Sequence, residues 1–177
     1  AQESKAFDAL TRAMDAHHFA LMHVGDASNA VTAGLKLIEV AEQAGDTVLA
    51  TRARLNTASV LNHVGLFEQA QPLLERSLID ARVRRMRILE GFAVHNLGMT
   101  YARLGKLEEG ISLERQAARI ADECGAARLR IHARVYETNF LVWRGAPGDF
   151  SAALTLANFL IEETRAMPAL GVSAMFS

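Results

Sequence analysis

Histidines at a fixed spacing are the first residues in this sequence that could bind a metal ion. His23 and His63 lie 40 residues apart. A shared metal would need both imidazole nitrogens within coordination distance and further ligands, but no carboxylate or cysteine recurs beside them. Neighbouring helical layers lie about 10 Å apart, which separates the rings. We therefore predict no metal site and no cofactor, and we expect His17 and His18 to straddle core and surface.

A basic run is the next candidate, because clustered arginines can bind phosphate or nucleic acid. The run consists of Arg82, Arg84, Arg85 and Arg87. Basic residues near a helix end also complement the helix dipole. The net charge is −1, from 19 basic and 20 acidic residues, and no aromatic platform is interleaved, so we predict no direct nucleic-acid binding. An acidic protein partner stays open as an alternative, since the patch could be extended by Arg128, Arg130 and Arg134.

Nucleophilic and acid–base catalysis have no clear candidate. Cys124, the single cysteine, precedes Gly125 at the end of an expected helix, where the helix dipole disfavours a thiolate. The carboxylate pairs Glu108–Glu109 and Glu162–Glu163 fall on helices where solvation explains them. Glycine-rich phosphate loops and the GxSxG, HExxH and Cys-x-x-Cys motifs do not occur. We therefore predict that the chain is not an enzyme.

Composition favours closely packed helices outside a membrane. Of the 177 residues half are hydrophobic, 6% are aromatic and three are proline, which suits helices rich in Ala and Leu. No run of about 18 apolar residues occurs, so we expect no membrane span and no membrane partner. One cysteine excludes an internal disulfide and fits a cytoplasmic location.

Four glycines recur every 40 residues, each between two apolar helical patterns: Gly25, Gly65, Gly105 and Gly145. Glycine adopts positive φ without a Cβ clash and so ends a helix and begins a turn. Five positions after the first three glycines we expect close helix crossings at small residues, namely Ala30, Ala70 and Gly110. Further turns are expected near Gly45 and Gly125. At the equivalent place, the second repeat has the polar run RVRRMR instead of a glycine.

This period predicts an all-α chain of four repeats, each a helix A followed by a helix B. The repeats span 4–44, 45–84, 85–125 and 126–167, within a single domain over 1–177. The expected A helices are 4–24, 47–64, 87–104 and 127–144, and the expected B helices are 27–44, 67–83, 107–124 and 149–166. Residues 168–177 are predicted to begin a fifth helix A, with Pro168 in its first turn.

The third and second repeats resemble tetratricopeptide repeats. The third has Asn96, Leu97, Gly98, Tyr101, Leu104, Gly105, Leu107, Gly110 and Ala117 at the signature places, and the second has Asn56, Ala58, Leu61, Gly65, Phe67, Ala70 and Ser77. In the degenerate first and fourth repeats, His17 and His18 replace a Leu-Gly pair, and APGDF is inserted after Gly145. The family unit has 34 residues, and a 40-residue unit is similar to the long-helix subclass of kinesin light chains and of bacterial signalling ATPases and transcriptional activators. The resemblance implies a right-handed α-solenoid.

The resemblance also implies that the A helices line a concave groove for a protein or peptide ligand. Aligned positions there mix aromatic, Met, Asn and Arg side chains, which offer apolar anchors and groups that reach backbone amides. The predicted partner-binding residues are Arg12, Phe19, Arg52, Asn62, His63, Phe92, His95, Met99, Arg103, His132, Asn139 and Trp143. The alternative is that these positions are solvated and bind nothing.

By this analogy the chain is a non-catalytic interaction scaffold, the sensor or partner-binding arm of a bacterial signalling or transcription regulator. A second hypothesis is a small-molecule effector site lined by Phe92, His95, Met99, His132 and Trp143. A peptide predicts contacts along several repeats, whereas an effector predicts a compact pocket. The sequence has no initiator Met and stops in mid-pattern, so we expect a piece of a longer protein. A cut solenoid exposes apolar ends, which predicts a possible homodimer through Met167, Leu170, Val172 and Phe176.

Overall fold

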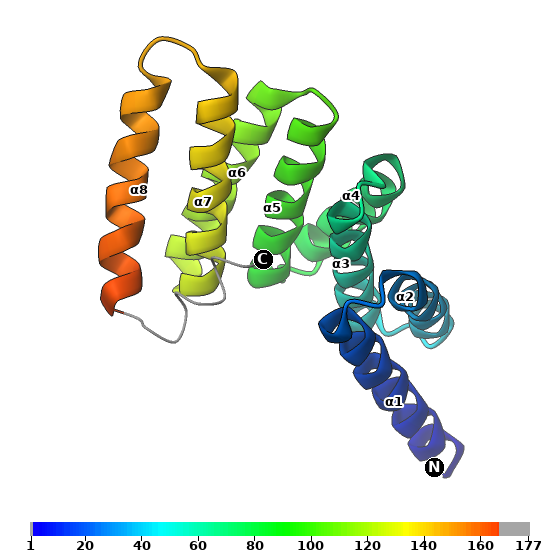
Figure 1. Ribbon diagram of the computed structural model, residues 1–177. Helices are drawn as coiled ribbons and strands as arrows, with labels where there is room; N and C mark the ends of the chain where they lie inside the picture. Colours follow the sequence, from blue (N-terminus) through cyan, green and yellow to red (C-terminus); the bar gives the residue numbers. More distant parts are fainter. Residues whose placement is uncertain (1, 167–177) are drawn as a thin grey trace. The chain divides into compact units, whose positions relative to one another are not determined.

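The structure, a computed structural model, describes residues 2–166, and within them it contains eight α-helices and no strand (Figure 1). The helices are α1 (Gln2–Val24), α2 (Ala27–Gln43), α3 (Thr47–His63), α4 (Phe67–Val83), α5 (Arg87–Arg103), α6 (Leu107–Cys124), α7 (Ala127–Arg144) and α8 (Asp149–Ala166). All eight predicted helices are confirmed, with ends within two residues of those expected. The predicted fifth helix A and the residues Met167, Leu170, Val172 and Phe176 lie outside the described residues.

Two compact units divide the chain, residues 1–89 and 90–177. In unit 1, α1 packs against α2, α2 against α3 and α3 against α4, and the centre of the α2–α3 contact is a buried cluster of Leu37, Ile38, Ala41, Leu49, Ala50 and Ala53. In unit 2, α6 packs against α7 and α7 against α8. One buried cluster there joins four helices through Ala102, Ile111, Phe140, Leu141 and Ala153. The prediction of a single domain stays a prediction.

The turns adopt the left-handed backbone that the glycine spacing predicted. Gly25, Gly65, Gly105 and Gly145 have φ between 63° and 84°. At the turn from helix B to the next helix A, repeats 1 and 3 have Gly45 and Gly125, also at positive φ, whereas repeat 2 has Arg85 at φ 55°. A residue with a Cβ is disfavoured by about 1 kcal/mol in this region, so the period of turns persists in repeat 2 at an energetic cost.

Of the three predicted close helix crossings, the one at Gly110 is shown by its contacts. Ala30 and Ala70 are fully buried. At Gly110 a Cβ atom would lie 2.8 Å from the Cβ of Ala102 and 2.9 Å from the carbonyl oxygen of Gly98, so no larger residue fits without a shift. This contact sets the separation of α5 and α6.

The insertion in the fourth repeat shifts helix B by three residues. Gly148, which is 43 residues after Gly105, has φ 88° and is followed five residues later by the buried Ala153. The loop is fixed by Asp149, whose carboxylate accepts hydrogen bonds from Ala146 N at 2.9 Å and from the Arg144 side chain at 2.7 Å. Positions along α8 therefore correspond to positions along α6 with an offset of 43.

Candidate partner-binding surface

In unit 2 the facing sides of α5 and α7 carry a continuous row of rings. Ring centroids are 5.9 Å apart for His95 and His132, 5.3 Å for His95 and Tyr136, and 5.8 Å for Tyr136 and Phe140. The row ends at Trp143, 5.4 Å from Phe140. Four of these rings come from α7, at spacings of four, four and three residues. This periodicity keeps the four side chains on one helix face. The structure therefore brings predicted residues of α5 and α7 together.

The accessible end of this row combines four chemically different groups. The Trp143 ring is 49% exposed, and the guanidinium carbon of Arg103 lies 4.5 Å from its centroid. Asn139 is exposed one turn before Trp143, and Met99 is partly buried against the cluster that contains Phe140. We call Met99, Arg103, Asn139 and Trp143 the α5–α7 patch. It presents an aromatic ring, a cation, an amide and a thioether within a few turns of helix.

His95 lies beneath the surface and is only 4% exposed. Its Nδ1 is 2.8 Å from Oε2 of Glu114, which is fully buried. Burial lowers the pKa of His95 to about 4, and burial together with the neighbouring Glu137 carboxylate raises the pKa of Glu114 well above its usual range. His95 is therefore neutral at pH 7, and burial favours the protonated, uncharged form of Glu114. A ligand on this face would meet His132, whose pKa is also lowered to about 4, mainly by burial and then by His95.

Two buried carboxylates under the row were missed by the sequence analysis. Glu137 accepts from Nε of Arg115 at 2.7 Å and from Nη1 of Arg134 at 2.8 Å, whereas Oε1 of Glu114 has no hydrogen-bond partner. The helical period gives a usable signal, because Glu114 shares a face of α6 with Gly110 and Ala117. Because Gly110 and Ala117 are buried, a polar residue between them on the same face of α6 also lies in the interior.

One explanation of the paired carboxylates was wrong. Solvation does not suffice for Glu163, which is partly buried and accepts from Nη2 of Arg130 at 2.8 Å. Glu108 accepts from Nη1 of Arg144 at 2.6 Å. These carboxylates connect neighbouring helices through ion pairs.

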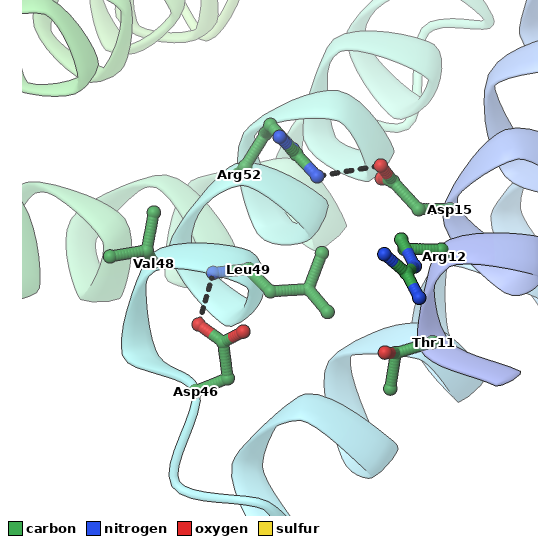
Figure 2. A pocket seen from close by; sticks show the side chains of 7 residues that line it. All are labelled: Thr11, Arg12, Asp15, Asp46, Val48, Leu49 and Arg52. Atoms are coloured by element: carbon green, nitrogen blue, oxygen red, sulfur yellow. Dashed lines mark hydrogen bonds and ion pairs between the residues drawn. The ribbon is translucent and has the colours of Figure 1, made fainter. Parts of the chain in front are cut away.

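In unit 1 the structure brings Arg12 and Arg52 to one pocket between α1 and α3. The pocket has a volume of about 310 Å³ and is lined by Thr11, Arg12, Asp15, Asp46, Val48, Leu49 and Arg52 (Figure 2). Nη2 of Arg52 donates to Oδ2 of Asp15 at 2.6 Å, and Asp46 caps α3 by accepting from Leu49 N at 3.0 Å. Two cations and two carboxylates balance the charge of this pocket.

The other predicted residues of unit 1 do not line this pocket. Phe19 is 56% exposed and packs on His23, with ring centroids 4.0 Å apart. His63 lines a separate pocket of about 270 Å³ that also includes Met22. Asn62 is buried. The Phe92 side chain, on α5 of unit 2, is partly buried.

The prediction that His17 and His18 straddle core and surface is confirmed, because His17 is exposed and His18 is fully buried. Neither ring nitrogen of His18 has a hydrogen-bond partner. Burial lowers its pKa, although the Asp15 carboxylate acts in the opposite direction. His18 is therefore an uncharged core residue at neutral pH.

The basic run lies beside acidic side chains. Arg84 lines a pocket of about 520 Å³ together with Arg76, Glu42 and Asp80. The pocket also contains the buried Arg54, which sequence analysis missed and which donates to Glu42 and, at 3.0 Å, to Asp80. Among the described residues, no group of three or more His, Cys, Asp or Glu side chains is arranged to hold a metal ion. No described helix is long and apolar enough to cross a membrane.

Comparison with known proteins supports the fold at the level of architecture. No model of a protein family matches the chain, and no curated protein matches its sequence. Among solved structures, a Rap protein complexed with competence and sporulation factor superposes with a TM-score of 0.75 at 17% identity. The fold is a TPR-like α-solenoid. The match covers 84% of this chain and 41% of the Rap chain, so the chain spans less than half the length of that protein.

Proposed function

We propose that this chain is a non-catalytic scaffold that binds a peptide or protein segment, and that the α5–α7 patch is its principal contact surface. The observation that carries this proposal is the half-exposed Trp143 ring held under Arg103, beside Asn139 and Met99. Trp and Arg dominate the binding energy of protein interfaces because they bury large areas and form directional contacts.

The patch is suited to an extended ligand. A Trp ring already fixed by packing on Phe140 and Arg103 loses little side-chain freedom on binding, which favours affinity. Asn139 can donate to and accept from the same peptide unit of a ligand backbone. The row from His132 to Trp143 extends along about 16 Å of α7 at 1.5 Å per residue, a length that matches several residues of extended peptide better than one compact effector.

We place the scaffold in a bacterial signalling or transcription regulator, as its sensor or partner-binding arm in the cytoplasm. This assignment rests on the resemblance to the 40-residue tetratricopeptide subclass and on the likeness to a Rap protein that was solved with competence and sporulation factor. The single cysteine agrees with a reducing compartment.

Selection from a phage-displayed library of random peptides tests the proposal directly. Peptides selected on the wild type are measured against a triple variant of the patch, Met99→Ala, Asn139→Ala and Trp143→Ala. A matched control replaces three exposed apolar side chains elsewhere, by Leu35→Ala, Ile79→Ala and Phe159→Ala. We expect the patch variant to weaken binding at least about tenfold, since truncation of one anchor costs more than 1 kcal/mol, and the control to bind normally. Equal binding by both variants would refute the patch.

A further inference from the structure

The exposed face of α4 differs from the equivalent faces of α2 and α6 by two apolar side chains. Ile79 and Val83 are 54% and 77% exposed, and their spacing of four residues puts them on one helix face. The equivalent places of repeats 1 and 3, forty residues away, hold four exposed polar side chains, Glu39, Gln43, Arg119 and Glu123. Among the first three repeats, therefore, the second alone presents apolar groups at these two places.

Arginines flank the two apolar side chains. Arg76, whose side chain is 62% exposed, lies one turn before Ile79, and the exposed Arg84 follows Val83 at the end of the helix. Within residues 2–166, Arg84 forms no ion pair or hydrogen bond through its side chain. Residues 76–87 contain five arginines and one carboxylate, a local charge of +4 in a chain whose net charge is −1. This end of α4 therefore attracts anionic groups although the whole chain does not.

The pocket of about 520 Å³ in unit 1 opens beside this face, because Arg76, Val83 and Arg84 all line it. Oδ2 of Asp80 accepts from Nη1 of the buried Arg54 at 3.0 Å and lies 3.3 Å from Nε of Arg76. One carboxylate thus orients two guanidinium groups. The contact through Nε leaves the Nη donors of Arg76 for a ligand. In total the pocket is lined by three arginines and two carboxylates, so it has an excess of positive charge.

We infer that Arg76, Ile79, Val83 and Arg84, which we call the α4 patch, bind an acidic segment of a protein partner. The two arginines are about 12 Å apart along the helix axis at 1.5 Å per residue, a length of about four residues in an extended peptide. Alternate residues of an extended peptide face the same way. Two carboxylates can therefore reach the arginines, while an apolar side chain midway between them packs on Ile79 and Val83. The inference does not depend on the proposed function, since the α5–α7 patch lies on other helices.

A nucleic acid fits the α4 patch less well than an acidic protein segment does. A phosphate at every nucleotide would bring a continuous line of negative charge past Glu42 and Asp80, which line the same pocket. The α4 patch also has no aromatic ring on which a base could stack. A protein segment can instead place its carboxylates at the arginines alone and use an apolar side chain between them.

Peptide selection on a protein that lacks the other surface tests the inference. A phage-displayed library of random peptides is selected on the full chain with Met99→Ala, Asn139→Ala and Trp143→Ala. Fluorescence polarisation then measures the selected peptides on this protein and after two further changes to the α4 patch, Arg76→Gln with Arg84→Gln, and Ile79→Gln with Val83→Gln. The matched control removes two cations from the exposed faces of α2 and α6, by Lys36→Gln with Arg119→Gln.

We expect the selected peptides to carry two carboxylates about four residues apart with an apolar residue between them. Each change to the α4 patch should weaken their binding at least about tenfold, whereas the control should bind normally. All the replaced side chains are exposed, so each variant should unfold at the same temperature as its parent. Peptides that bind the α5–α7 patch of the wild type should not respond to changes in the α4 patch.

Three results would overturn the inference. One is that no peptide is selected, or that the selected peptides bind the α4-patch variants and the control equally. Another is that a thymidine oligonucleotide binds and is lost with Arg76→Gln and Arg84→Gln, which would assign the patch to nucleic acid. The third is self-association in sedimentation that disappears with Ile79→Gln and Val83→Gln, which would assign the patch to a second copy of the chain.

Discussion

In the first repeat His18 of α1 faces Gly34 of α2, whereas in the third repeat Gly98 of α5 faces Glu114 of α6. The four residues occupy equivalent places, because His18 and Gly98, like Gly34 and Glu114, are 80 residues apart. A Cβ atom at Gly34 would lie 2.8 Å from Nε2 of His18, and one at Gly98 would lie 2.8 Å from Oε1 of Glu114. Each crossing thus pairs one large polar side chain with one glycine.

The two crossings show that the repeat constrains the summed volume of a helix pair and leaves open which helix supplies it. Protein interiors are close-packed, so a large residue on one helix requires a small one opposite. Both crossings also contain polar atoms without a partner, the ring nitrogens of His18 and Oε1 of Glu114. Such atoms cost about 1–3 kcal/mol each. The chemical difference is that Glu114 has His95 as a partner, whereas His18 has none.

The largest difference in stability is expected between substitutions at Leu97 and at His17, the residues that precede Gly98 and His18. Leu97 is 3% exposed, whereas its counterpart His17 is exposed. Leu97→Asp buries a charge without a partner and should lower the free energy of unfolding by about 3–5 kcal/mol, while His17→Asp should change it by less than about 0.5 kcal/mol. Urea unfolding followed by circular dichroism measures both. A normal transition for Leu97→Asp would show that the alignment of the repeats is wrong.

The constraint on the summed volume of the two facing residues is tested by giving the third repeat the residues of the first. Gly98→His alone places two large side chains at one crossing and should destabilise by about 3 kcal/mol, at the upper end of overpacking costs. Adding Glu114→Gly should recover at least about 1 kcal/mol of coupling in a double-mutant cycle. Unfolding of the two single variants and the double variant measures this term. Strict additivity would mean that the two positions do not share volume.

The acid dependence of stability should differ between the crossings, first through His18. Its pKa is lowered in the folded state, so the unfolded chain binds the proton more readily, and stability is full above pH 6.5 and falls as the pH drops toward the folded value. His18→Leu should remove this contribution and make the loss of stability below pH 6.5 less steep. His95 and His132 retain their own contributions, because their pKa values also fall to about 4. An unchanged pH profile would contradict burial of a neutral His18.

Glu114 should give the opposite slope. Its pKa is raised in the folded state, so its contribution to stability is full below pH 4.5 and decreases as the pH rises toward the folded value. Glu114→Gln keeps a group that can hydrogen-bond to His95 and removes the titration. The variant should gain stability relative to the wild type between pH 5 and pH 8, as measured by urea unfolding at both values. A constant difference across that range would show that Glu114 does not titrate with a raised pKa.

Sequence periodicity was sufficient for the helices and turns but insufficient for the buried polar groups. Glycine spacing and apolar period are local properties, which is why all eight helices were predicted within two residues. Burial of Arg54, His95 and Glu114 depends on the helix opposite. His95 was assigned to the groove, and neither Arg54 nor Glu114 was identified from the sequence. Arg12 and Arg52 were predicted as groove residues, and the structure places them in one pocket with Asp15 and Asp46. Tertiary packing determines which side chain each polar residue pairs with, and the local sequence pattern does not contain that information.

The smallest expected effect concerns the turn that differs between repeats. Arg85 has φ 55° where repeats 1 and 3 have glycine, so Arg85→Gly removes a backbone strain of about 1 kcal/mol. Part of that gain is offset by the greater entropy of glycine in the unfolded chain, which leaves a net stabilisation of about 0.5 kcal/mol. Arg84→Gly is the matched control, because Arg84 has φ −94° and gains nothing from glycine. If both variants lose stability equally in thermal unfolding, the left-handed turn of repeat 2 is not strained, and the repeat tolerates arginine there as well as it tolerates glycine.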